Sequence, residues 1–196
     1  MADPVAFWTG EGGDEYTVRN VVEPASRVQG FGLAFPDVRE IESVLEVGAN
    51  CGHNLYALDG GVCRHGTLYA GIDVCPAVCD EAMAPILRGS ATNIPAFDAS
   101  FDLVFTCGVL IHVPPADLPK AYDELVRVSR RYVLIMEYYA SEPTPIRWRG
   151  QDGLLWKRNF GKEMSERHPE LNLEATGFLG KDAGFDDVTW WRWRKP

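Results

Sequence analysis

The sequence predicts an α/β fold with a parallel central sheet and helices on both faces. Short apolar runs of strand length alternate with segments of helical periodicity through most of the chain. The clearest helix is Pro115–Arg130, in which apolar residues recur three and four positions apart. The 196 residues are 46% hydrophobic and 24% charged, which is typical of one globular domain with a substantial core.

The predicted strands are buried apolar runs. In chain order they are Ser43–Gly48, Thr67–Val74, Ile86–Gly89, Phe101–Thr106, Tyr132–Glu137, Leu171–Leu179 and Val188–Trp193. Right-handed crossovers between parallel strands place the loops that follow them on one edge of the sheet. We therefore expect the ligand site at that edge.

Helices are expected between these strands. One begins at Gly52, and another follows Pro76 and continues over Ala77–Ala84, since proline suits the first turn of a helix. Trp156, Phe160 and Met164 are four apart and predict one face of a later helix. Two prolines predict a loop over Ser141–Trp148.

Residues 1–40 differ from the rest, because glycines interrupt every pattern and aromatic residues stand among them. Short helices and loops that lean on the core are expected there. We expect a single domain over residues 1–196, with its core over 41–196.

The charge of the chain is negative and unevenly placed. A net charge of −9 argues against a general nucleic-acid binder. Residues 1–100 hold 5 of the 19 basic and 14 of the 28 acidic residues, and residues 101–196 hold 14 of each. The acidic first half thus suits a positively charged ligand, and the second half supplies Lys and Arg side chains for a negatively charged one. The alternative is that the uneven charge is only solvated surface.

Targeting signals are not recognisable. Met1–Gly10 has no basic stretch before an apolar core, and runs such as Tyr132–Met136 are too short to cross a bilayer. The five cysteines are odd in number and none forms a C-x-x-C pair, which favours reduced, buried thiols over a metal site. We expect a cytoplasmic protein with no membrane partner and no metal.

The most informative segment is Glu46–Gly52, where a predicted strand runs into a glycine-rich turn. Glycine lets the backbone bend sharply and lets a ligand approach it closely. Asp73 ends the next strand, 25 positions after Gly48, where a carboxylate can accept hydrogen bonds from ribose hydroxyls. The dinucleotide pattern would need glycine at Asn50 and His53, so a nucleoside without a pyrophosphate is favoured. Glu46 also suits a ligand with a positive end.

Three segments resemble the motifs of class I methyltransferases that depend on S-adenosylmethionine (SAM). Val44–Gly52 resembles the first motif, and Gly71–Pro76 resembles the second. Gly89–Val104 resembles the third motif with the following strand, in register and without gaps. The resemblance implies SAM as cofactor and a Rossmann-like class I fold. In that fold the mostly parallel sheet has an antiparallel C-terminal strand.

A closer likeness, to the methyltransferases associated with pseudaminic acid biosynthesis, covers nearly the whole chain. It is carried by Phe7–Asn20, Gly108–Val113, Arg131–Tyr139, Glu142–Pro145, Arg149–Gly150, Trp156–Phe160 and Asp187–Trp190. This resemblance suggests a small polar acceptor, a sugar or sugar nucleotide of the nonulosonic acid type, with an anionic group.

The cofactor residues that the resemblance implies come from several segments. They are Tyr16, Arg19, Glu46, Gly48, Asn50, Gly52, Asp73, Val74, Ser90, Ala91, Cys107 and Gly108. Asn50 departs from the family, where glycine is commonest, so its side chain must fit beside the methionine part of SAM. Ser90 replaces an aspartate that often contacts adenine, so recognition is expected from the Ala91 backbone with assistance from Ser90.

Candidate catalytic residues follow the fourth and fifth strands. His112 can serve as a general base or orient the acceptor, or it can simply bind backbone at a helix start. Glu137 can take a proton from the acceptor or hold its ammonium form. Tyr138 and Tyr139 can shield the sulfonium by cation–π attraction, unless one of them only packs.

Substrate-binding candidates lie on both sides of the core. Trp8, Tyr16, Arg19 and Asn20 stand where this fold commonly has a lid, and Arg19 could clamp the SAM carboxylate. The basic residues Arg147, Arg149, Lys157 and Arg158 could pair with an anion on the acceptor. Arg149 and Arg158, with Trp8 and Tyr139, are the expected acceptor contacts.

Two other classes of function remain open at this stage. One is a SAM-binding regulator without turnover. The other is a nucleotide-dependent oxidoreductase, which the absent G-x-G-x-x-G pattern disfavours.

Overall fold

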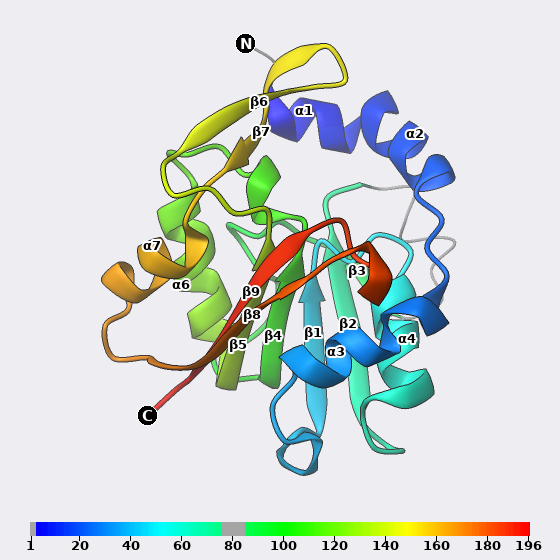
Figure 1. Cartoon of the computed structure of the whole chain (residues 1–196), viewed down its shortest axis with the longest axis vertical. Coiled ribbons are helices and arrows are strands. Elements are labelled where there is room, and N and C mark those ends of the chain that lie inside the picture. Colours follow the sequence, from blue (N-terminus) through cyan, green and yellow to red (C-terminus); the bar gives the residue numbers. More distant parts are fainter. Residues whose placement is uncertain (1–2, 76–84) are drawn as a thin grey trace.

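The computed structural model describes residues 3–75 and 85–196. Its main sheet has seven strands in the order β3-β2-β1-β4-β5-β9-β8 (Figure 1). The strands are β1 (Ser43–Val47), β2 (Leu68–Asp73), β3 (Ile86–Arg88), β4 (Phe101–Cys107), β5 (Ser129–Glu137), β8 (Asn172–Leu179) and β9 (Val188–Arg194). The first five are parallel, whereas β9 is antiparallel to both β5 and β8. The predicted α/β fold, with its antiparallel C-terminal strand, is confirmed.

Helices cover both faces of this sheet. They are α1 (Pro4–Thr9), α2 (Glu11–Arg19), α3 (Val28–Ala34), α4 (His53–Gly61), α6 (Leu118–Val128) and α7 (Phe160–Arg167). Helices α3 and α4 pack on one face, and α6 and α7 pack on the other. Short 3-10 turns lie at η1 (Pro24–Arg27), η2 (Val38–Glu40), η3 (Leu110–His112) and η4 (Lys181–Ala183). No helix in the described ranges is long and apolar enough to span a bilayer.

The two faces of the central strands each bury their own core. In β4, Leu103 and Phe105 pack toward α3, whereas Val104 between them packs toward α6. All three side chains are fully buried. Burial on both faces explains why these strands read as continuous apolar runs in the sequence rather than as alternating ones.

The region after β5 differs from its prediction. Residues 144–148, which were assigned to a loop because of their prolines, form strand β6 (Thr144–Trp148), paired antiparallel with β7 (Gln151–Lys157). Arg149 and Gly150 between them both have positive φ, +53° and +75°. That pair of conformations is typical of the two-residue turn that joins twisted hairpin strands. Pro145 is tolerated in β6 because this sheet has only two strands, so both are edge strands.

Helix boundaries also differ from the sequence pattern. Trp156 lies in β7 and not on the face of a helix. Helix α7 begins only at Phe160, where the Asn159 side chain accepts a hydrogen bond from Lys162 N. Ser129 and Arg130 belong to β5. The helix expected over Ala77–Ala84 lies outside the described residues.

Candidate active site

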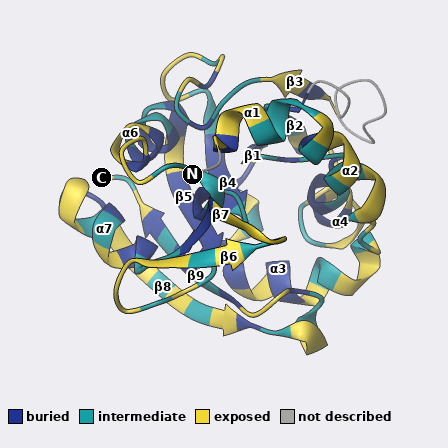
Figure 2. Cartoon of the chain, turned by 90° about the horizontal axis from the view of Figure 1, so that it is seen from above, coloured by how far each residue is buried: buried dark blue, intermediate teal, exposed yellow. Residues whose placement is uncertain are grey.

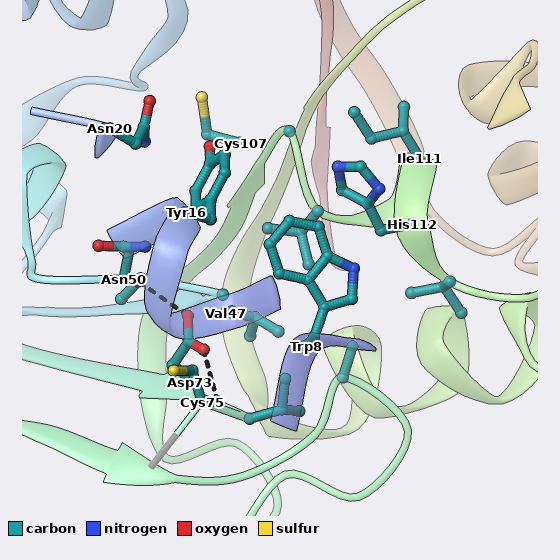
Figure 3. Close-up of a pocket in the computed structure, with 18 of the residues that line it drawn as sticks. Trp8, Tyr16, Asn20, Val47, Asn50, Asp73, Cys75, Cys107, Ile111 and His112 are labelled. Carbon is teal, nitrogen blue, oxygen red and sulfur yellow. Dashed lines mark hydrogen bonds between the residues drawn. The ribbon is translucent and has the colours of Figure 1, made fainter. Parts of the chain in front are cut away.

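A cavity of about 420 Å³ lies at the carboxyl ends of β1, β2 and β4. Helices α1 and α2 and the β6–β7 hairpin lie over this edge, as the view from above shows (Figure 2). In Figure 3, Asn50 and Asp73 stand on one side of the cavity, and His112 and Trp8 stand on the other. A cavity thus lies at the edge of the sheet where the ligand site was predicted.

The glycine turn after β1 forms the floor of the first side. Gly48 has φ +76°, and a Cβ there would lie 2.3 Å from Val109 Cγ2. Asn50 has φ +47°, a conformation that asparagine tolerates better than most residues. Its Oδ1 accepts from Cys51 N at 2.7 Å, and its Nδ2 donates to Thr17 Oγ1 of α2 at 3.3 Å. Asn50 thus joins the turn to the segment above it.

Asp73 lines the cavity at the end of β2. Its Oδ2 accepts from Asn50 N and its Oδ1 from Cys75 N, each at 2.9 Å. The Val74 amide also acts on this carboxylate, and because a carboxylate offers about four acceptor positions, Asp73 still retains capacity for a ligand hydroxyl. Burial raises the pKa of Asp73, although the backbone amides act against that rise.

Glu46 occupies a different place from the one expected. Its side chain is fully buried in β1 and does not line the cavity. Asn54 Nδ2 donates to Glu46 Oε1 at 2.6 Å, while Oε2 has no partner in the described structure. Burial raises the pKa of Glu46 to about 8. The expectation of a direct contact with the positive end of the ligand is corrected, because the carboxylate lies beneath the turn.

Arg27 is a lining residue that the sequence analysis missed. Its Nη1 donates to Asn54 Oδ1 at 2.5 Å, and its Nε donates to Gly184 O at 3.0 Å. Its guanidinium also lies over the Phe185 ring, 4.9 Å from the centroid. Arg27 belongs to no motif, and only the tertiary fold brings it to the cavity. Arg19 lines the cavity as well, but it is exposed and lies 5.7 Å from the centroid of Tyr16.

The remaining predicted cofactor residues lie on the cavity wall, with one exception. Tyr16, Val74, Ser90, Ala91, Cys107 and Gly108 all line it. The Ser90 hydroxyl accepts from Thr92 N at 3.2 Å and therefore also holds its own turn. Gly52 does not line the cavity, because it is the left-handed residue that precedes α4.

His112 forms the opposite wall with two tryptophans. Its ring centroid lies 4.7 Å from that of Trp8 and 5.2 Å from that of Trp148. Nδ1 lies 2.6 Å from Leu154 O, and because a carbonyl only accepts, Nδ1 carries the proton. Burial lowers the pKa of His112 to about 4. The ring is therefore neutral at physiological pH, with the lone pair on Nε2. Trp148 was not predicted to line the cavity, because the prolines of Ser141–Trp148 indicated a loop.

Glu137 does not stand at the cavity. It is fully buried, and its carboxylate accepts from the backbone amides of Val109, Leu110 and Ile111 at 3.0, 2.9 and 3.4 Å. Burial raises the pKa of Glu137 to about 7, although the hydrogen bonds from these amides act to lower it. The expectation of a base at the acceptor is corrected, since Glu137 instead anchors the turn that carries His112.

Of the two tyrosines that follow β5, only one lines the cavity. Tyr138 lines the cavity, with Lys157 Nζ 5.5 Å from its ring centroid. Tyr139 is 47% exposed and packs toward Trp191, away from the cavity wall. The expectation for Tyr139 as an acceptor contact is therefore corrected.

Of the basic cluster, Arg149 lines the cavity, stacked 4.8 Å from the centroid of Trp148. Arg158 pairs with Glu163 at 2.8 Å and does not line the cavity, which corrects its expected role. Arg147 donates to Gly150 O at 3.1 Å within the hairpin. The cavity thus receives one cation from this cluster.

Comparisons with known proteins agree with this arrangement. A family profile described as a methyltransferase domain matches residues 45–135. No curated protein matches the chain by sequence. The structure is similar to a putative methyltransferase from Haloferax volcanii, solved in complex with the activator Trm112 (18% identity, 100% and 99% of the two chains covered, TM-score 0.69).

Two further solved structures have bound ligands. One is the 1,6-didemethyltoxoflavin N1-methyltransferase of Burkholderia thailandensis (17% identity, 100% and 91% of the chains, TM-score 0.65). The other is the magnesium protoporphyrin IX methyltransferase of Synechocystis (13% identity, 100% and 99%, TM-score 0.65). At these identities the likeness shows the fold. The methyltransferase domain matched over residues 45–135 and the class I methyltransferase fold support a SAM-dependent transferase, with SAM as its cofactor.

Proposed function

We propose that this enzyme methylates a small polar acceptor that carries one anionic group, a sugar or sugar nucleotide of the nonulosonic acid type. The observation that carries the proposal is the pairing, in one cavity, of a nucleoside-binding side at Asp73 with an aromatic side that presents His112 and Arg149. Tyr16 and Cys107 stand between the two sides (Figure 3).

The first side fits SAM. Asp73 retains hydrogen-bonding capacity for ribose hydroxyls, and the wall at Ser90 and Ala91 suits adenine. Gly108 has φ +69°, and a Cβ there would meet no atom within 4 Å, so the backbone leaves the cavity open where the cofactor passes. Arg27 supplies a fixed cation for the methionine carboxylate. When bound, SAM supplies a methyl group already activated by positive sulfur, so the protein's part is alignment and exclusion of water.

The second side suits a ring-shaped molecule with a single anion. Trp8 and Trp148 offer flat apolar faces, and Arg149 offers a guanidinium stacked on one of them. Because Arg158 is neutralised by Glu163, a single carboxylate or phosphate fits better than a polyanion. The Burkholderia enzyme, whose structure contains 1,6-didemethyltoxoflavin, sets a precedent for a small acceptor on this fold. The sugar class itself rests on the sequence resemblance.

The cofactor site is tested by titration calorimetry with SAM. Asp73→Ala should lower the affinity about tenfold or more, since hydrogen bonds to a charged group contribute roughly 1.5–3 kcal/mol. Asp59→Ala, an exposed carboxylate on α4, is the matched control and should leave the affinity unchanged. Equal affinity for SAM in the wild type and a folded Asp73→Ala variant would refute the site.

The acceptor is tested by a screen for release of S-adenosylhomocysteine with sugar acids, sugar nucleotides, small acids and amines. Turnover with an anionic sugar supports the proposal. Turnover with an apolar phenol or a lipid alone would overturn the acceptor class and leave the methyltransferase intact. Tight binding of SAM without turnover of any acceptor would favour the regulator.

A further inference from the structure

We propose that the acceptor is methylated on an uncharged amine nitrogen, whose hydrogen is accepted by Nε2 of His112. The inference rests on the proposed function, because it concerns the acceptor side of the same cavity. It goes further by naming the nucleophile, which neither the fold nor the family match defines.

The hairpin fixes the orientation and the tautomer of His112. Leu154 O of β7 accepts the Nδ1 hydrogen at 2.6 Å, so Nε2 carries an in-plane lone pair. Trp8 from α1 and Trp148 from β6 pack against the ring and restrict its rotation. A group fixed in this way accepts a hydrogen from whatever donor faces it in the cavity.

The surroundings oppose a positive charge on His112. The residues that pack on the ring are the uncharged Trp8 and Trp148, and its bonded partner is a carbonyl rather than a carboxylate. Glu137, which holds the turn that carries His112, already accepts from three backbone amides. Arg149, stacked on Trp148, adds a further positive charge to this wall. His112 therefore acts as a hydrogen-bond acceptor and not as a base strong enough for an alcohol.

Five other titratable groups that line the described cavity do not replace it. Burial raises the pKa of Tyr138 and of Cys107 to about 12, so both hold their protons at neutral pH. Asp73 lies on the cofactor side (Figure 3). Asp117 and Asp186 line the cavity but are exposed. An alcohol must lose its proton to become a good nucleophile, whereas an uncharged nitrogen already has a free lone pair.

The transfer then balances without a base. The nitrogen lone pair forms the new bond to the methyl carbon, and the electron pair of the broken sulfur–carbon bond stays on sulfur. The nitrogen becomes positively charged as the sulfonium becomes neutral. Its proton leaves afterwards to solvent, so His112 positions the nucleophile and need not be protonated.

The nucleophile is tested with pairs of acids that differ only in one group. The pairs are the methyl glycosides of neuraminic acid and of its 5-hydroxy counterpart, and 4-aminobenzoate and 4-hydroxybenzoate. We expect S-adenosylhomocysteine release with an amine member. For the aliphatic amine of the neuraminic acid glycoside, the rate should rise with pH along the titration of that amine. Equal or faster turnover of the hydroxy member would overturn the proposal. Loss of SAM binding in calorimetry would instead refute the proposed function.

The role of His112 is tested in two ways, first without an acceptor and then with the amine. Nitrogen NMR of the full chain, with labelled histidine and bound S-adenosylhomocysteine, should show His112 as the neutral Nδ1–H tautomer from pH 5.5 to 8. Titration of His112 within that range would overturn the proposal. His112→Phe should retain SAM affinity and lower kcat/KM for the amine about tenfold, the value of one hydrogen bond. His65→Phe, at an exposed histidine that does not line the cavity, is the control and should leave kcat/KM for the amine unchanged.

Discussion

Arg27 Nη1 donates a hydrogen bond of 2.5 Å to Oδ1 of Asn54, and Asn54 Nδ2 donates in turn to Glu46. The three side chains come from η1, α4 and β1, and they connect the cavity wall to the centre of the sheet. Both ends of the amide are used, its oxygen toward the cation and its nitrogen toward the carboxyl. Binding at the cavity and stability of the core are therefore linked through one asparagine.

Removing the cation of Arg27 should weaken SAM binding. Arg27→Ala is expected to lower the affinity about tenfold or more, because a carboxylate then loses a charge-assisted hydrogen bond. Arg19→Ala is the comparison, and a smaller effect is expected because Arg19 is exposed and screened by solvent. Calorimetry of both variants shows which of the two arginines contributes more to SAM affinity. A larger loss for Arg19→Ala would assign the clamp to Arg19, as the sequence suggested.

The burial of Glu46 predicts a specific pH dependence of stability. Its pKa is about 8 in the folded protein and 4.5 in the unfolded chain, so the folded state keeps a proton that the unfolded state releases. The free energy of unfolding should then fall as the pH rises from about 4.5 to about 8, by at most ~1.4 kcal/mol per pH unit. Glu46→Gln imitates the protonated acid and should flatten this fall.

The measurement is urea unfolding at several pH values for the wild type, Glu46→Gln and the exposed control Glu15→Gln. Glu137, with a pKa raised to about 7, contributes in the same direction and remains in all three proteins. Parallel profiles for the wild type and Glu46→Gln would show that Glu46 is ionised in the folded protein.

A methyl group at Gly108 should obstruct the cofactor. Gly108→Ala places a Cβ in open space at the cavity, at a residue with φ +69°. Gly66→Ala is the matched control, since Gly66 has φ +91°, equally open surroundings and no part in the cavity. Both variants should lose about 1 kcal/mol of stability from backbone strain. Weaker SAM binding is expected for Gly108→Ala alone, and equal binding by both would show that the cofactor does not pass Gly108.

Closure of the N-terminal segment over the cofactor can be measured by proteolysis. Helices α1 and α2 meet the cavity through Trp8, Tyr16 and the bond between Thr17 and Asn50. Trypsin cleavage after Arg19 should slow when SAM is added, while cleavage after Arg64, in an exposed loop distant from the cavity, should not. If SAM slows neither cleavage, the segment does not close on the cofactor.

The sequence predicted the fold and most of the residues that line one side of the cavity, because both depend on local patterns. Buried parallel strands read as apolar runs, and the turn after β1 requires left-handed residues such as Gly48 at fixed positions. Asp73 was found for the same reason, since it ends a strand whose neighbour is known from the topology.

The acceptor side was harder to predict because it depends on which side chains already have partners. Glu137 and Arg158 have the residue types of a base and an anion-binding site, but backbone amides satisfy the first and Glu163 satisfies the second. Arg27 and Trp148 reach the cavity from segments without a motif. The prolines before Trp148 also concealed a hairpin, whose signal was the Arg149-Gly150 turn.

The β6–β7 hairpin pairs with itself and not with the seven-stranded sheet, to which it is joined near its base by one bridge between Tyr139 and Arg158. Its sequence can therefore diverge without disturbing the strand ladder or the turn after β1. Because it carries Trp148 and Arg149, such divergence acts first on the acceptor wall. In evolutionary terms the hairpin is an exchangeable module, and a library confined to residues 144–150 should select new acceptors on an unchanged cofactor scaffold.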